Sequence, residues 1–277
     1  MKKTKVIKET LLLIVAIFYL SPIYIMLVNS FKNRQELYEN VLAFPKDFSF
    51  QYYIAAIEKM NFLSAFGNSL YITVISVIFI VILSSMTAWM LARTNNRISK
   101  IIFMTFIATM LIPFQTIMMP LMQEMNWIMK TTGIPMLNTR GGLIFMNIGF
   151  NTSMAVFLYH GFIKSIPISL EEAAMIDGAS KFSIFWRIIF PMLKPITVTV
   201  MILNVISIWN DYLLPSLVLT QKELRTIPLS TFYFFGEFTI QWNQAMAGLV
   251  LTIIPVVIFY VFAQKYIIKG IAEGAVK

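Results

Sequence analysis

The sequence contains no cysteine and little charge. Asp, Glu, Lys and Arg make up 13% of its 277 residues, whereas a typical soluble domain has about 25%. Without cysteine the chain can form no disulfide, no thiolate metal site and no thiol nucleophile. With so little polar side-chain area it can be neither a typical soluble enzyme nor a disordered protein.

Two further absences restrict the chemistry. No glycine is followed by lysine anywhere, so the phosphate-binding loop of many ATPases is missing. The single histidine, His160, has no cluster of carboxylates around it in the sequence, which argues against a metal site and favours a structural or interfacial role. No grouping of His, Asp, Glu and Ser indicates a membrane-embedded enzyme.

Apolar residues dominate the sequence instead. The chain is 58% hydrophobic, with a mean hydropathy of +0.76, and a bilayer core is crossed by roughly 20 apolar helical residues. The first apolar run is longer than the about 7–15 residues of a signal peptide and lacks a cleavage site, so we interpret it as an uncleaved span. The sequence predicts an all-α polytopic membrane protein with six transmembrane helices, near residues 10–31, 69–92, 101–121, 141–162, 195–219 and 245–264.

Basic residues indicate an orientation. If the N-terminus is cytoplasmic, 14 of the 22 Lys and Arg residues fall in cytoplasmic segments, which favours both termini inside. Because these residues are spread over several loops, the net charge of +9 does not indicate nucleic-acid binding. The expected parts are the N-terminus with the first span (1–31), an extracytoplasmic loop with a short helix near Tyr52–Lys59 (32–65), a five-span core (66–264) and a cytoplasmic tail (265–277).

The connection at residues 164–191 has the most informative pattern. Ser169 followed by Glu172 predicts a capping box at the start of a helix, and Gly178 permits a sharp bend. A second helical piece is expected over Phe182–Phe190, ending at Pro191. The spacing of Met175, Ala179, Phe182 and Trp186 predicts one shared apolar face.

This helix–bend–helix has two interpretations on pattern alone. An amphipathic helix can dock into a groove of a partner protein, or it can lie on the membrane surface. The pattern does not separate them.

A resemblance favours the first interpretation. Glu172-Ala173-Ala174, three residues, Gly178, nine residues and Ile188-x-Phe190-Pro191 resemble the Glu-Ala-Ala loop of ATP-binding-cassette (ABC) importer permeases, with Phe190 where leucine is usual. In that family the loop is a cytoplasmic coupling helix that sits in a cleft of the ATPase subunit. The resemblance implies an ATPase-coupling role for Glu171, Glu172, Ala173, Ala174, Asp177, Gly178, Phe182, Ile188 and Pro191.

Other segments resemble one subclass. Asn68-Ser69-Leu70, Ala92-Arg93, Ile176–Ala179 and Trp209–Pro215 are similar to the permeases of carbohydrate importers, specifically the maltose-transporter MalG-like family, although Ala88-Trp89-Met90 stands where that family tends to have Ala-Tyr-Ala.

This resemblance implies the type I permease fold, no catalysis and a bacterial or archaeal cell membrane. The implied partners are a second, different permease, two ATP-binding subunits, an extracytoplasmic solute-binding protein and membrane lipid. No cofactor is expected on this chain, because ATP and magnesium would be used by the partner ATPase.

Polar residues inside the spans are candidates for a translocation path or gate, because burying them in a membrane is costly. Asp211 is the only acid among them, and we favour a structural or gating role for it. Amides can equally join helices, so the path assignment stays open for Asn147, Asn151, Asn204, Trp209, Asn210, Asp211 and Gln115. The alternative function is an ion-gradient-driven secondary transporter of a small polar solute, for which Asp211 alone is thin support.

Overall fold

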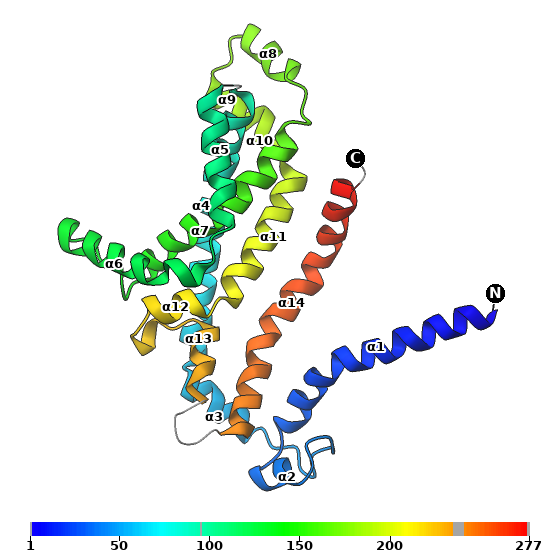
Figure 1. The fold of residues 1–277 in the computed structure, drawn as a ribbon. Helices are drawn as coiled ribbons and strands as arrows, with labels where there is room; N and C mark the ends of the chain where they lie inside the picture. Colours follow the sequence, from blue (N-terminus) through cyan, green and yellow to red (C-terminus); the bar gives the residue numbers. More distant parts are fainter. Residues whose placement is uncertain (1, 95, 235–240, 276–277) are drawn as a thin grey trace. The chain divides into compact units, whose positions relative to one another are not determined.

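The computed structural model describes residues 2–94, 96–234 and 241–275, which contain helices and connecting turns and no strand (Figure 1). Contacts divide the chain into two compact units: Met1–Ala65 with Ile227–Ile258, and Phe66–Thr226 with Phe259–Lys277. Two long helices, α4 (Phe62–Arg93) and α14 (Trp242–Ala275), pass from one unit into the other. Each unit is described by itself.

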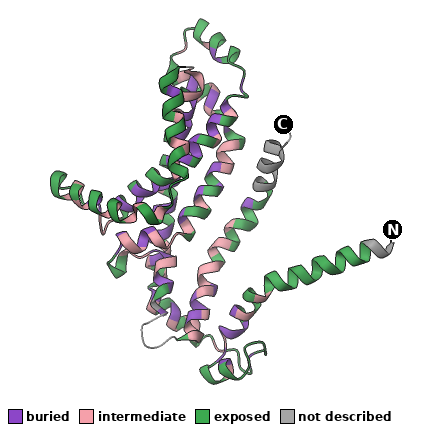
Figure 2. Cartoon of the chain, in the orientation of Figure 1, coloured by how far each residue is buried: buried purple, intermediate pink, exposed green. Residues whose placement is uncertain are grey.

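The first unit contains the predicted first span and extracytoplasmic loop. Besides the ends of α4 and α14, its helices are α1 (Lys2–Asn29), α2 (Arg34–Glu39), α3 (Gln51–Met60), α13 (Ile227–Thr231) and the 3-10 turn η3 (Phe232–Phe234). Residues 5–20 of α1 are all exposed (Figure 2). Since residues 11–20 of this surface are all apolar, lipid or another protein must cover that part of it.

The loop after α1 is folded around a buried lysine. Lys32 is 1% exposed, and its Nζ donates to Asn29 Oδ1 at 3.1 Å and to the Asn40 carbonyl at 2.8 Å. Burial lowers the pKa of Lys32, and the nearby charge of Glu36 partly opposes this shift. The predicted short helix near Tyr52–Lys59 lies within α3.

The second unit is built around α7 (Arg140–Ile163), which packs against α5 and α11. Tyr159 in α7 is fully buried, and its hydroxyl donates to Thr197 Oγ1 at 3.0 Å. The other elements are α5 (Arg97–Met110), α6 (Phe114–Thr132), α8 (Ser169–Ile176), α9 (Lys181–Ile184), the π-turn η1 (Phe185–Ile189), α10 (Phe190–Met192), α11 (Lys194–Asn210), α12 (Leu213–Val218) and the 3-10 turn η2 (Lys222–Leu224).

Contacts at the two ends of α7 show how the spans run. After its C-terminal end, the Ile166 carbonyl accepts a hydrogen bond from Arg93, the last residue of α4. Before its N-terminal end, the Asn138 amide donates to the Val218 carbonyl at the end of α12. Because α4 and α7 therefore finish at the same end, the α5–α6 segment between them must return the chain across the unit once.

In the described part of the chain four helices are long and apolar enough to cross a membrane, and the number reaches the predicted six if each of two bent pairs, 97–110 with 114–132 and 181–192 with 194–210, is one span. The helices of the third and fifth predicted spans are each interrupted. The span at 101–121 is interrupted between Met110 and Phe114, where α5 and α6 meet at 107°, because Pro113 has no N–H and disfavours helix before it. The span at 195–219 is interrupted at Asp211 and Tyr212, between α11 and α12.

The start of α7 allows a test of this packing. A Cβ at Gly142 would overlap the backbone carbonyl of Met136, whereas a Cβ at the adjacent Gly141 would have no atom within 4 Å. We expect Gly142→Ala to destabilise the protein by about 1–3 kcal/mol, as overpacking usually does. Gly141→Ala, one residue away on the same turn, is the matched control. Melting temperatures measured in detergent would contradict the packing if the two variants melted together.

Candidate functional site

The connection between α7 and α11 projects from one end of the second unit as α8, a bend and α9 (Figure 1). Gly178 at the bend has a φ of +80°, a conformation that favours glycine, so the predicted bend is confirmed. The predicted capping box was wrong. The amides of Glu171 and Glu172 donate to the Ile168 carbonyl at 2.9 and 3.1 Å, so α8 already begins at Ser169 with no side-chain cap.

The second helical piece also differs from its prediction. It runs over residues 181–192 as α9, η1 and α10, so it continues one residue past Pro191. At η1 the Phe190 amide donates to the Phe185 carbonyl five residues back, which widens the helix for one turn. The predicted common face of Met175, Ala179, Phe182 and Trp186 is divided by the Gly178 bend, and beyond the bend Phe182 and Trp186 remain together with their ring centroids 6.1 Å apart.

One residue of α8 faces inward. Glu171 is 5% exposed, and its carboxylate accepts hydrogen bonds from Trp89 Nε1 at 3.0 Å and Arg93 Nε at 2.7 Å, both on α4. Arg93 also donates through Nη2 to the Ile166 carbonyl at 3.0 Å. Hydrogen bonds to charged groups are stronger than neutral ones, so these contacts fix α8 to the end of α4. Trp89 and Arg93 were not among the predicted site residues.

The other predicted coupling residues are placed differently from Glu171. Ala174 and Ile188 are half-buried, and the remainder are exposed, namely Glu172, Ala173, Asp177, Gly178, Phe182 and Pro191. Ile176, whose large apolar side chain is 87% exposed, lies on the same short helix and was not predicted as a site residue. This end of the unit therefore presents apolar and acidic side chains outward on a helix that is anchored from inside.

A second candidate site is a hollow of about 430 Å³, open to the surface and formed by α6, α7, α11 and α12, which we call the polar cavity because six of its eleven lining residues are polar. Five residues of the predicted translocation path line it: Gln115, Asn147, Asn151, Asn210 and Asp211. Asn151 is held by Ser207, whose hydroxyl donates to Asn151 Oδ1 at 3.2 Å.

Two of the predicted path residues do not line this cavity. Asn204 donates to the Val200 carbonyl of its own helix at 2.8 Å. The Trp209 ring packs against Phe66 with the ring centroids 5.8 Å apart. Asp211 lines the cavity, but its Oδ1 accepts from the Leu213 amide at 3.0 Å, so this carboxylate is committed to the start of α12.

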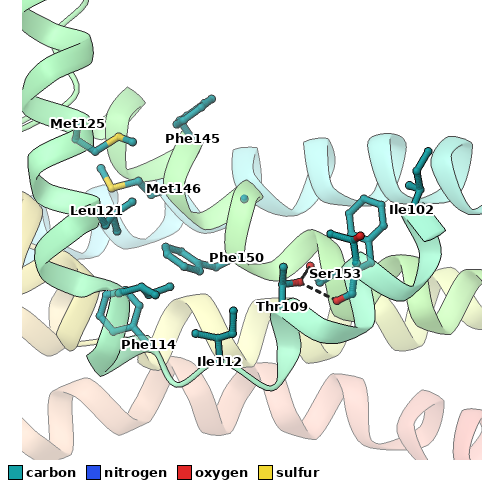
Figure 3. A pocket seen from close by; sticks show the side chains of 14 residues that line it. Ile102, Thr109, Ile112, Phe114, Leu121, Met125, Phe145, Met146, Phe150 and Ser153 are labelled. Carbon is teal, nitrogen blue, oxygen red and sulfur yellow. Dashed lines mark hydrogen bonds between the residues drawn. The ribbon is translucent and has the colours of Figure 1, made fainter. Parts of the chain in front are cut away.

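An apolar hollow of about 560 Å³ adjoins the polar cavity and is lined by α5, α6 and α7 (Figure 3). The two hollows share Phe114 and Phe150, whose rings meet edge to face with centroids 5.3 Å apart. His160 lines neither hollow and stacks on Phe103 with the ring centroids 3.7 Å apart.

The family model of the binding-protein-dependent transport system inner membrane component matches residues 80–273. The chain belongs to this family. The matched range includes α8, the residues that anchor it and the polar cavity.

Relatives of this inner membrane component are similar over nearly their whole length. The chain is 49% identical to the probable starch degradation products transport system permease protein AmyC of Thermoanaerobacterium thermosulfurigenes, over 96% of this chain and 94% of that protein. It is 37% identical to the melibiose/raffinose/stachyose import permease protein MelC of Bacillus subtilis, over 95% and 94%.

A crystal structure of a bacterial ABC transporter involved in the import of the acidic polysaccharide alginate has the same fold as this inner membrane component. The TM-score is 0.81 at 22% identity, over 96% of each chain. The type I ABC importer permease fold that the resemblance implied is thereby confirmed.

The anchoring of α8 in this inner membrane component can be tested with two adjacent glutamates. Glu171→Ala removes the carboxylate that pairs with Arg93, and losing one partner of a buried pair costs about 3 kcal/mol. We expect the α8 segment of this variant to be cut faster by trypsin at the flanking Lys164 and Lys181.

Glu172→Ala is the matched control, since Glu172 is exposed and pairs with no residue in the described part of the chain. Equal cleavage rates in the two variants, measured on detergent-purified protein, would contradict an anchoring role for Glu171.

Proposed function

We propose that this chain is the transmembrane permease subunit of an ABC importer that carries a sugar or oligosaccharide. The observation that carries the proposal is the anchored α8 helix with its outward residues, found in a chain of the binding-protein-dependent family. The choice of a sugar as substrate is inferred from the relatives, since AmyC is named for starch degradation products and MelC for melibiose, raffinose and stachyose.

The proposed complex contains a second permease, two ATP-binding subunits and an extracytoplasmic solute-binding protein. In this proposal α8, the N-terminus and the C-terminus are all cytoplasmic, as the distribution of basic residues predicts. This chain is not catalytic, and the partner ATPase uses ATP and magnesium. A second solved structure shows the alginate transporter in complex with a pentasaccharide-bound periplasmic protein, which supports a solute-binding protein as partner.

α8 has one buried residue that faces α4 and several exposed residues, and this arrangement suggests how a movement of the ATPase reaches the permease. Glu172 and the exposed residues around Gly178 sit in the ATPase cleft, while Glu171 holds the same helix to α4. When ATP binding closes the ATPase pair, α8 is displaced and takes the end of α4 with it. The permease pair then alternates between inward-open and outward-open states, a rigid-body transition of packed elements.

The ion-gradient alternative has less support. Secondary transporters place ionisable residues near mid-membrane to hold the coupling ion. Asp211 was the one candidate, and its carboxylate is engaged by the backbone of α12.

The composition and energy source of the complex provide the direct test. A C-terminally tagged chain, solubilised from its native membrane in mild detergent, is expected to co-purify with an ATPase and a second permease by mass spectrometry. Proteoliposomes of that complex with its binding protein should take up sugar with ATP and without ion gradients. Recovery of the chain alone, after a control complex survives the same detergent, would overturn the proposal, as would uptake that stops when the gradients collapse.

Two glycines with similar backbone conformations allow a test of whether the bend at Gly178 docks into the ATPase. Gly178 and Gly133 both have positive φ, +80° and +73°, and open space around the Cβ position, so aspartate strains both backbones alike. Gly178→Asp places a carboxylate in the proposed ATPase cleft, where burying an unpaired charge costs several kcal/mol. Since about 1.4 kcal/mol is a factor of ten, we expect uptake to fall about tenfold or more with the protein still inserted. Gly133→Asp should retain uptake, and equal uptake in both variants would refute docking at Gly178.

A further inference from the structure

We infer that the polar cavity between α6, α7, α11 and α12 is a binding subsite for an uncharged sugar, so that this chain contacts the transported molecule itself. The inference rests on the proposed function and adds to it the place of binding and the electrical character of the substrate.

The cavity presents hydrogen-bonding groups that the protein does not use. Gln115 and Asn147 line it, and the side-chain amide of neither forms a hydrogen bond within the described part of the chain. Asn210 donates through Nδ2 to the Ile206 carbonyl, which leaves its Oδ1 as a free acceptor. An amide carries both donors and an acceptor, and sugar hydroxyls need both.

These amides lie on helices of the membrane-spanning unit. An unsatisfied polar group that faced lipid tails would cost several kcal/mol, so polar residues in spans face other helices or a water-filled space. Asn147 is 3% exposed and still borders the cavity. The cavity therefore fits a hydrated path in which an entering ligand replaces water on the amides.

The wall of the cavity supplies apolar contact as well. Phe114 and Phe150 contribute their rings, held edge to face. Ligand sites combine apolar and aromatic walls with a few placed polar groups. The C–H faces of a sugar ring suit the aromatic side, and its hydroxyls suit the amides.

The charged residues that line the cavity determine which class of sugar it can bind. Among the residues that the structure describes, no lysine or arginine lines the cavity, so these residues provide no cation to pair with a carboxylate or phosphate of a ligand. Asp211 is the one ionisable residue among the described residues of the lining, and a carboxylate there disfavours an anion. The cavity therefore suits neutral oligosaccharides and not uronates, unlike the acidic polysaccharide named for the alginate transporter.

The absence of native cysteine makes a direct test possible. Gln115→Cys and Asn151→Cys place single thiols at the cavity, and Gln123→Cys, an exposed position on α6 outside it, is the matched control. Each variant is assembled into the full transporter and labelled with N-ethylmaleimide, and the label is measured on this chain after electrophoresis. Maltotriose and raffinose are the neutral probes, and trigalacturonate is the charged one.

We expect saturating maltotriose or raffinose to slow labelling at positions 115 and 151 at least about threefold, with no change at 123. Trigalacturonate should protect neither position. Lack of protection by both neutral sugars, or equal protection at 123, would overturn the subsite. Equal protection by trigalacturonate would overturn its preference for neutral sugars.

Uptake separates this inference from the function on which it rests. Gln115→Ala should raise the KM for uptake about three- to tenfold, the loss of roughly one hydrogen bond. Gln123→Ala should behave as wild type. A wild-type complex that transports sugar while Gln115→Ala has an unaltered KM would overturn the subsite and leave the proposed function standing. A wild-type complex with no ATP-driven uptake would refute the proposed function itself.

Discussion

The hydrogen-bonded pair of Glu171 and Arg93 is the interaction on which the arrangement of the candidate coupling site depends. α8 has eight residues, and a helix of that length is not stable alone in water. It keeps its place because the Glu171 carboxylate is buried against Arg93 and Trp89. Burying a charge is tolerated only where charge and hydrogen bonds compensate it, so the position of α8 is narrowly defined.

The same rule governs the breaks in the spans. Where a helix stops inside a membrane unit, the freed backbone groups need partners. Between α11 and α12 the carboxylate of Asp211 accepts from the Leu213 amide. Between α5 and α6 the break at Pro113 adjoins Phe114 and Gln115, which border the polar cavity. Both interruptions therefore lie at the one place where five of the predicted path residues meet.

Composition and motif spacing predicted the class, the positions of the long apolar helices and the bend at Gly178. Apolar runs are long and nearly free of charge, and Gly178 needs no partner to permit its φ. The sequence does not predict which residues interrupt a helix, because Pro113 and Asp211 lie inside runs whose hydropathy alone looks continuous. Other prolines, such as Pro22 and Pro255, are tolerated within helices, so proline by itself does not locate a break.

Glu171 shows why the candidate site was harder to predict. Two adjacent acids at the start of a helix are equivalent in sequence, yet residues next to each other on a helix point about 100° apart. Which one turns inward depends on Arg93 and Trp89, some 80 residues earlier in the chain. In the sequence, the Ala92-Arg93 pair contributes only to the family resemblance, and no local pattern indicates that Arg93 binds Glu171.

The anchor also connects the two candidate sites mechanically. Between Asn68 and Arg93, α4 contains no proline and no break, and these residues are joined to opposite ends of the second unit. Asn68 donates to the Glu223 and Arg225 carbonyls, beyond α12, and Arg93 binds Glu171 of α8. The span of about 38 Å between them follows from the helical rise. Under the proposed function, a displacement of α8 moves α4 as one rod, while the interrupted α5–α6 and α11–α12 segments can bend around the cavity. Continuous and broken helices then have separate tasks, transmission for the first and adjustment to the sugar for the second.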